Sequence, residues 1–188
     1  MTDVHEERSP LAWEDALPLA FHAGRQSEDG LLMVRREADN LRILGTCEAL
    51  EDRRERGEDS GVAAEAHALE HKVELLIELV SQLVARGVPR PPTVAVRLSA
   101  LGAVWSPAEG GVASAQHPPT VGTVGSLELH LRHGLAEPLR LPARAVAGEA
   151  GWPAAVVFDG LSTAELDALE RFVFRQHRRT IAGRRRPR

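Results

Sequence analysis

The stretch VAAEAHALEHKVELLIELVSQL, residues 62–83, carries the strongest pattern in this chain. Its apolar positions follow one another at alternating intervals of four and three residues: Val62, Ala66, Leu69, Val73, Leu76, Val80 and Leu83. This spacing is a coiled-coil heptad repeat, with Ala66, Val73 and Val80 at position a and the other four at position d. We therefore expect a long helix that associates with other helices along this seam.

The apolar face of this helix is wider than a two-stranded seam. Ile77 and Val84 fall at position e and Leu79 falls at position g, next to the a and d rows. Such a wide face favours more than two helices around the common axis. The alternative is a long amphipathic helix that packs only inside its own subunit, since ordinary core helices show similar spacing.

A second helix is predicted before the heptad stretch. From Ser27, a candidate N-cap, to about Arg54, one apolar face is formed by Leu31, Val34, Ala38, Leu41 and Leu44, and an adjoining one by Ile43, Cys47 and Leu50. Residues 57–61 separate the two helices, and Gly87 followed by Pro89 ends the second one. The two helices are expected to form a helical hairpin.

Composition limits the classes of protein to consider. Cys47 is the only cysteine among 188 residues, which excludes an internal disulfide, and it reads as a small core residue. No signal peptide and no apolar run long enough to span a bilayer is evident, so we expect a cytoplasmic protein.

The net charge of −4 conceals a basic C-terminus, because residues 171–188 contain eight arginines and no acidic residue. These arginines read either as a surface for phosphates or an acidic partner, or as a solvated helix end with a frayed tail. No basic stripe with interleaved aromatic residues occurs elsewhere, and nucleic-acid binding is not expected.

The second half of the chain reads as β structure. Val94, Val96 and Leu98 alternate with small or polar neighbours, as do Leu127, Leu129 and Leu131, and glycine and proline separate the short segments. At least five closely spaced strands favour a small antiparallel barrel. A last helix is predicted from Ser162, where Ser162 and Glu165 match an S-x-x-E capping box, and it is expected to cover one mouth of the barrel.

These residues resemble the PilZ domain family, whose members have a six-stranded barrel followed by a C-terminal helix. The resemblance covers about residues 88–182 and is carried by VAVRLSALG (94–102), by the strand ending VVF (156–158) and by LERFVFRQHRR (169–179). The fold class is therefore expected to be α+β. We expect an N-terminal extension (1–26), a helical oligomerisation module (27–87), a PilZ-like barrel with its helix (88–182) and a basic tail (183–188).

Typical PilZ domains are receptors for cyclic di-GMP, which they hold with an RxxxR motif and a (D/N)xSxxG motif. Here Ser99 and Gly102 fit the second motif, but Arg97 stands where the family has Asp or Asn. A guanidinium group is donor-only, so it cannot accept hydrogen bonds from guanine N–H groups. Arg86 and Arg90 have the spacing of the first motif, but they lie at a helix end and close to Arg97. We expect Ser99 and Gly102 to serve turn geometry and cyclic di-GMP not to bind.

A PilZ-like barrel without ligand motifs, preceded by heptads, resembles an atypical subgroup that self-associates as tetramers. The resemblance implies a non-enzymatic regulator or adaptor without a cofactor, acting with other bacterial signalling or pilus proteins in motility, pilus function or virulence. The oligomerisation residues would be Val62, Ala66, Leu69, Val73, Leu76, Ile77, Val80 and Leu83. The rival hypothesis is a cyclic di-GMP receptor that uses Arg86, Arg90, Arg97 and Ser99.

A metal-dependent hydrolase is a second rival. His67, Glu70 and His71 match the H-x-x-E-H string of inverted zinc peptidases, and two histidines four residues apart lie on one helical face. The heptad assignment turns His67 and His71 toward solvent without an evident third ligand. We therefore expect no metal and no catalysis.

Overall fold

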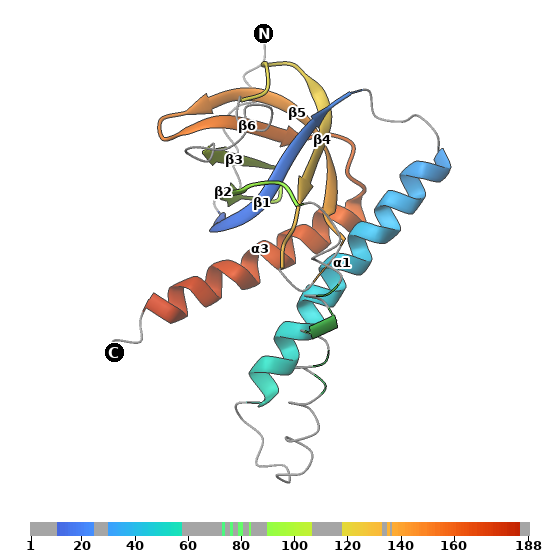
Figure 1. Ribbon diagram of the computed structural model, residues 1–188, viewed down its shortest axis with the longest axis vertical. Coiled ribbons are helices and arrows are strands. Elements are labelled where there is room, and N and C mark those ends of the chain that lie inside the picture. The colour runs from blue at the N-terminus through green and yellow to red at the C-terminus, as the bar shows by residue number, and fades with distance from the viewer. Residues whose placement is uncertain are drawn as a thin grey trace.

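The structure of the chain is a computed structural model. It describes residues 11–24, 30–57, 73, 76, 79–80, 83, 90–106, 118–132, 135 and 137–184. Most of this part of the chain lies in six strands and two long helices: β1 (Trp13–Ala23), α1 (Gly30–Gly57), β2 (Thr93–Leu98), β3 (Gly102–Ser106), β4 (Val124–Leu129), β5 (Leu139–Glu149), β6 (Trp152–Phe158) and α3 (Thr163–Arg184). Figure 1 shows the strands wrapped into a barrel and the two helices crossing near one end of it.

The six strands form a closed antiparallel barrel in the order β1-β2-β3-β6-β5-β4. Alternate residues point into its interior, as the sequence predicted for β2 and β4. The interior residues are almost fully buried: Val94, Val96, Leu98, Leu127, Leu129, Leu139 and Leu141. The predicted α+β fold with a small antiparallel barrel is therefore confirmed.

One strand of the barrel was missed. Residues 1–26 were expected to be an extension outside the barrel, but Trp13–Ala23 is strand β1. This strand pairs with β2 up to Pro18 and with β4 from Leu19 onward. Leu17, Pro18 and Leu19 are buried in succession at this change of partner, which breaks the alternation by which a strand is recognised. The barrel therefore begins before α1, and α1 lies between its first two strands in the sequence.

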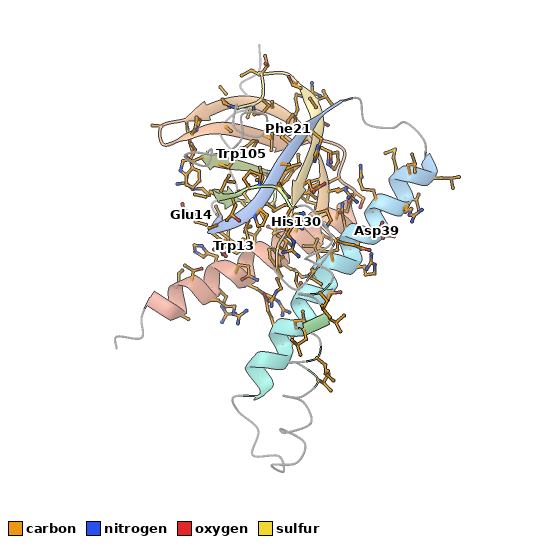
Figure 2. The ribbon with its side chains drawn as sticks, in the orientation of Figure 1. Trp13, Glu14, Phe21, Asp39, Trp105 and His130 are labelled. Carbon is orange, nitrogen blue, oxygen red and sulfur yellow. The ribbon has the colours of Figure 1, made fainter. Side chains whose placement is uncertain are left out.

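Helix α3 closes one mouth of the barrel. It begins with the predicted capping box, since the Ser162 hydroxyl accepts from the Glu165 N–H at 3.1 Å and the Glu165 carboxylate accepts from the Ser162 N–H at 3.0 Å. Leu169, Phe172 and Val173 are buried beneath it. The ring of Phe172 meets that of Trp13 edge-on, with centroids 5.5 Å apart, and Figure 2 shows Trp13 where β1 approaches α3.

Helix α1 packs against α3 and β5. Ile43, Leu44 and Cys47 are buried there, as expected of an apolar face. The N-terminal part of that predicted face lies on α1 but is not covered within the chain, because Leu31 and Val34 are 81% and 64% exposed. The helix begins at Gly30, and the proposed N-cap Ser27 lies outside the described residues.

A polar junction joins α1, α3 and β5 at the middle of α1. The Asn40 side chain, 1% exposed, donates to the Arg140 carbonyl at 2.8 Å and accepts from the Arg140 N–H at 2.9 Å. The same amide donates to the buried Glu165 carboxylate at 2.7 Å. Asn40 thus takes the place of a neighbouring strand at the start of β5 and fixes α1 to the barrel.

Candidate functional site

The described part of the heptad helix presents apolar side chains to solvent. Residues 73, 76, 79, 80 and 83 are helical. Their side chains are 40–66% exposed: Val73, Leu76, Leu79, Val80 and Leu83. Val62, Ala66, Leu69 and Ile77 lie outside the described residues. Within one chain, the four described side chains of the predicted seam and the adjoining Leu79 are therefore not buried.

Arg97 of the candidate nucleotide motif makes its contacts within the barrel. Arg97 on β2 donates to Glu14 at 2.7 Å and to Glu149 at 3.1 Å. Its guanidinium carbon lies 5.0 Å from the centroid of the Trp152 ring, within the range of a cation–π contact. Figure 2 shows Glu14 beside Trp13 at the start of β1. Two carboxylates and an indole therefore surround Arg97.

Sequence reasoning missed these neighbours of Arg97. Glu14 is brought opposite Arg97 by the β1–β2 register, and Glu149 and Trp152 pair with each other at the β5–β6 turn. In the sequence, Glu14 lies 83 residues from Arg97, and Glu149 lies 52 residues from it. If strand β1 had been recognised in the sequence, Glu14 would have been placed on the barrel wall. No other sequence pattern pointed to these neighbours of Arg97.

Ser99 and Gly102 build the turn between β2 and β3. The Ser99 hydroxyl donates to the Gly102 carbonyl at 3.0 Å and accepts from the N–H groups of Leu101 and Gly102 at 3.3 and 3.2 Å. A Cβ at Gly102 would lie 2.3 Å from the Val156 carbonyl oxygen, so the glycine is required by the close approach of β6. Ser99 and Gly102 thus both have a structural role in the β2–β3 turn.

Of the candidate RxxxR pair, Arg90 is among the described residues. Arg90 donates to the Leu135 carbonyl at 3.2 Å, and Arg86 lies outside the described residues. Nearby, Arg42, Ile43, Thr46, Leu135 and Glu137 line an open depression of about 210 Å³. An Arg42–Glu137 ion pair is part of this lining. This volume is below the roughly 300–1,000 Å³ typical of small-molecule sites.

Three arginines of α3 form ion pairs with α1. Arg171, Arg175 and Arg179 form ion pairs with Glu48, Asp52 and Glu51 of α1, respectively. The hydrogen bond to Asp52 raises the pKa of Arg175 above its usual value. Neither sequence interpretation of this basic segment anticipated that three of its arginines hold two helices together.

Glu51 is the centre of this contact between the helices. It is 1% exposed and accepts from Arg132 at 2.5 Å and from the Gln176 side chain. Arg179 lies 3.4 Å from the same oxygen. A buried carboxylate with several cationic and amide donors joins α1, α3 and the segment that follows β4.

Burial shifts the pKa values of two titratable side chains, Cys47 and His130. Desolvation raises the pKa of the Cys47 thiol to about 11. Burial also lowers the pKa of His130, which lies 3.3 Å from Glu128 and is labelled in Figure 2. A protonated thiol and a neutral imidazole are the forms expected of structural residues at pH 7.

The metal hypothesis finds no support in the described residues. They contain no group of three or more histidine, cysteine or acidic side chains placed to hold an ion. His67 and His71 themselves lie outside the described residues. In the same part of the chain, no helix has the length and apolar character needed to cross a bilayer.

Comparison with known proteins agrees with this architecture. The family model described as "Atypical PilZ domain, cyclic di-GMP receptor" matches residues 41–186. A crystal structure of a pathogenic protein from Xanthomonas campestris is 29% identical, with a TM-score of 0.65, and the match covers 92% of this chain and 90% of that one. That protein is described as a tetrameric PilZ domain self-assembled through an unusual helical bundle. Comparison with curated proteins found no similar sequence.

The family model covers well over half of the chain, including the barrel from β2 onward, and the solved structure shares the barrel with its helices. The chain belongs to the atypical PilZ domain family.

Proposed function

We propose that this chain is a non-enzymatic PilZ-type regulatory or adaptor protein that self-associates through its heptad helix, as a tetramer, and does not bind cyclic di-GMP. The observation that carries the proposal is the exposure of the described heptad side chains, such as Leu76 at 60% and Leu83 at 66%. Rows of exposed valine and leucine on a helix are stabilised when matching rows of other helices cover them.

Four copies are favoured over two for two reasons. The apolar residues at positions e and g widen the face beyond a two-stranded seam, and Leu79 at g is 54% exposed. The similar protein from Xanthomonas campestris, which matches over 92% of this chain, assembles as a tetramer through a helical bundle. By this reasoning, the barrels are held at the periphery of a helical core.

The arrangement around Arg97 supports the lack of cyclic di-GMP binding. The guanidinium donates from Nε to Glu14 and from Nη1 to Glu149, so two of its N–H groups are engaged within the barrel. A ligand with two phosphodiester groups would approach these carboxylates and be repelled by them. The Ser99 hydroxyl is engaged in the β2–β3 turn. Each retained part of the motif therefore has an internal partner.

The rival function is a cyclic di-GMP receptor, which is how the matching family model is described. Isothermal titration calorimetry separates the two. We expect no saturable heat with cyclic di-GMP up to about 1 mM. A titration to this concentration detects binding with a free energy as weak as about −4 kcal/mol. Micromolar binding that is lost in Arg90→Ala or Ser99→Ala would establish the rival. Asp159→Asn, which removes an acid paired with Arg144 elsewhere on the barrel, is the matched control.

Self-association is tested by sedimentation equilibrium of the full chain. Leu76→Asp with Val80→Asp places two charges on the seam and is expected to reduce the mass from four chains to one. Val121→Asp is the matched control, because Val121 is 65% exposed on a turn of the barrel and is not part of the heptads. A wild-type chain that sediments as a monomer at micromolar concentration removes the proposal.

A further inference from the structure

Helix α3 presents an aromatic ring to solvent. All seven aromatic residues of the chain, three tryptophans and four phenylalanines, lie in the described part, and Phe174 alone among them is exposed, at 47%. The guanidinium carbon of Arg178, one turn later, lies 5.7 Å from the centroid of the Phe174 ring. A single exposed apolar side chain needs no partner. The neighbours of Phe174 therefore decide whether this surface binds one.

Phe174 stands at the centre of a row of α3 residues spaced four positions apart, which we call the α3 ridge: Leu166, Glu170, Phe174, Arg178 and Ala182. Glu170, Arg178 and Ala182 are exposed, and Leu166 is half-buried. Residues with this spacing form a continuous ridge along a helix, and neighbouring helices pack by fitting such ridges into grooves. The ion pairs with α1 use other positions of α3, and Figure 1 shows the C-terminal half of α3 extending past the strands. The α3 ridge is therefore accessible to another molecule.

The side chains of the α3 ridge are complementary to the same row read in reverse. Glu170 and Arg178 lie four residues before and after Phe174, and Leu166 and Ala182 lie eight residues before and after it. If a second copy of the helix runs antiparallel and crosses at Phe174, Glu170 meets the second copy's Arg178. Leu166 then meets the second copy's Ala182, and the two Phe174 rings meet each other. Each pair joins opposite charges or two apolar groups. A parallel pair would instead place like charges side by side.

We infer that the α3 ridge binds the α3 ridge of a second copy of this chain, antiparallel and around a two-fold axis at Phe174. The contact is isologous, because both copies use the same surface. It shares no residue with the heptad rows, so it is a second interface that goes beyond the self-association proposed above. One helix crossing covers less than the roughly 1,200 Å² of a stable interface, so this contact is weak by itself.

Charge favours a second copy over an anionic membrane or an acidic protein as the occupant. Asp167 and Glu170 are exposed, and they lie seven and four residues before Phe174, on the same side of the helix. Their carboxylates would face lipid phosphates or acidic side chains and be repelled by them. In the antiparallel pair of helices, Glu170 meets an arginine instead.

Disulfide cross-linking of the full chain tests the contact. Cys47 is buried, so a cysteine introduced at an exposed position is the accessible thiol. Helix axes about 10 Å apart bring facing Cα atoms to about 5 Å, within the roughly 4.4–6.8 Å of a disulfide. Phe174→Cys is therefore expected to form a covalent dimer under mild oxidation. Thr163→Cys is the matched control, because Thr163 is exposed on the same helix but lies about 17 Å from the crossing, and it is expected not to cross-link.

Charge reversal tests the two symmetric ion pairs. In the Phe174→Cys chain, Arg178→Glu places carboxylates opposite each other and is expected to slow cross-linking about fivefold, as the loss of two exposed ion pairs would. Glu170→Arg together with Arg178→Glu exchanges the two charges and is expected to restore the rate. Circular dichroism is expected to show unchanged helical content in all these variants, because the replaced side chains are exposed.

The outcomes separate this contact from the heptad seam. If Phe174→Cys forms no covalent dimer, if Thr163→Cys forms as much, or if the charge exchange does not restore the rate, the α3 contact is wrong and the heptad proposal is untouched. If the dimer forms while the wild type sediments as a monomer at micromolar concentration, the α3 contact stands and self-association through the heptads fails. If Arg178→Glu leaves cross-linking unchanged but abolishes sedimentation with phosphatidylglycerol vesicles that the wild type binds, the surface binds a membrane and the inference is overturned.

Discussion

Replacement of Asn40 by alanine is expected to be the most destabilising polar change in the junction between α1 and the barrel. The side chain is 1% exposed and makes three hydrogen bonds of 2.7 to 2.9 Å. Alanine leaves the N–H and C=O of Arg140 without a partner on the side that Asn40 covers. It also removes one donor from the buried Glu165 carboxylate.

The magnitude follows from these three losses. Each lost bond to the Arg140 backbone costs about 1 kcal/mol, and the lost donor to a buried carboxylate costs about 2 kcal/mol. The expected decrease in the free energy of unfolding is therefore about 4 kcal/mol for Asn40→Ala, a large share of the roughly 5–15 kcal/mol of a typical domain.

Urea unfolding followed by circular dichroism measures this effect at one fixed protein concentration, because self-association makes apparent stability depend on concentration. Thr46→Ala is the matched control on the same helix. Its hydroxyl donates at 2.7 Å only to the Arg42 carbonyl within α1, so a change of about 0.5 kcal/mol or less is expected. A decrease below about 1 kcal/mol for Asn40→Ala would refute the junction as the element that fixes α1.

Three further predictions follow from buried groups. Cys47, the only cysteine, has its thiol pKa raised from 9.0 to about 11, so it should stay unreactive toward Ellman's reagent at pH 8 until the chain unfolds, and fast labelling of the native protein would contradict its burial. His130 has a pKa below 6.5 in the folded state, so unfolding takes up a proton at acidic pH. Thermal stability should therefore decline as the pH falls through and below 6.5. Thermal melts between pH 7.5 and 5 should show that His130→Gln flattens this decline. Glu51→Gln should cost about 3 kcal/mol in urea unfolding, because it leaves Arg132 without its buried carboxylate, whereas Arg171→Gln, which removes an exposed ion pair, should cost less than about 1 kcal/mol.

Local patterns predicted most of the fold. The Ser162 and Glu165 capping box is formed as the four-residue motif indicates, because both partners lie within one helical turn. The alternation in β4 places Leu127 and Leu129 inside the barrel because one face of the strand is buried. Strand β1 was missed because Pro18 stands where the strand changes partner, and burial there does not alternate.

Contacts between distant parts of the chain could not be predicted in the same way. The acids that surround Arg97 come from β1 and from the end of β5, and only barrel closure brings them to one place. The arginines of α3 looked like a free basic surface because the glutamates and aspartate that pair with them lie on α1, more than 100 residues earlier. A charge pattern within one segment does not reveal the charge of the segment that packs against it.

The central claim is that chains associate through exposed heptad rows without a nucleotide. Multi-angle light scattering of the full chain during size-exclusion chromatography, with and without cyclic di-GMP, tests it most directly. We predict a mass four times that of the 20.4 kDa chain in both conditions. A mass equal to one chain, or a tetramer that forms only when cyclic di-GMP is added, would contradict the account.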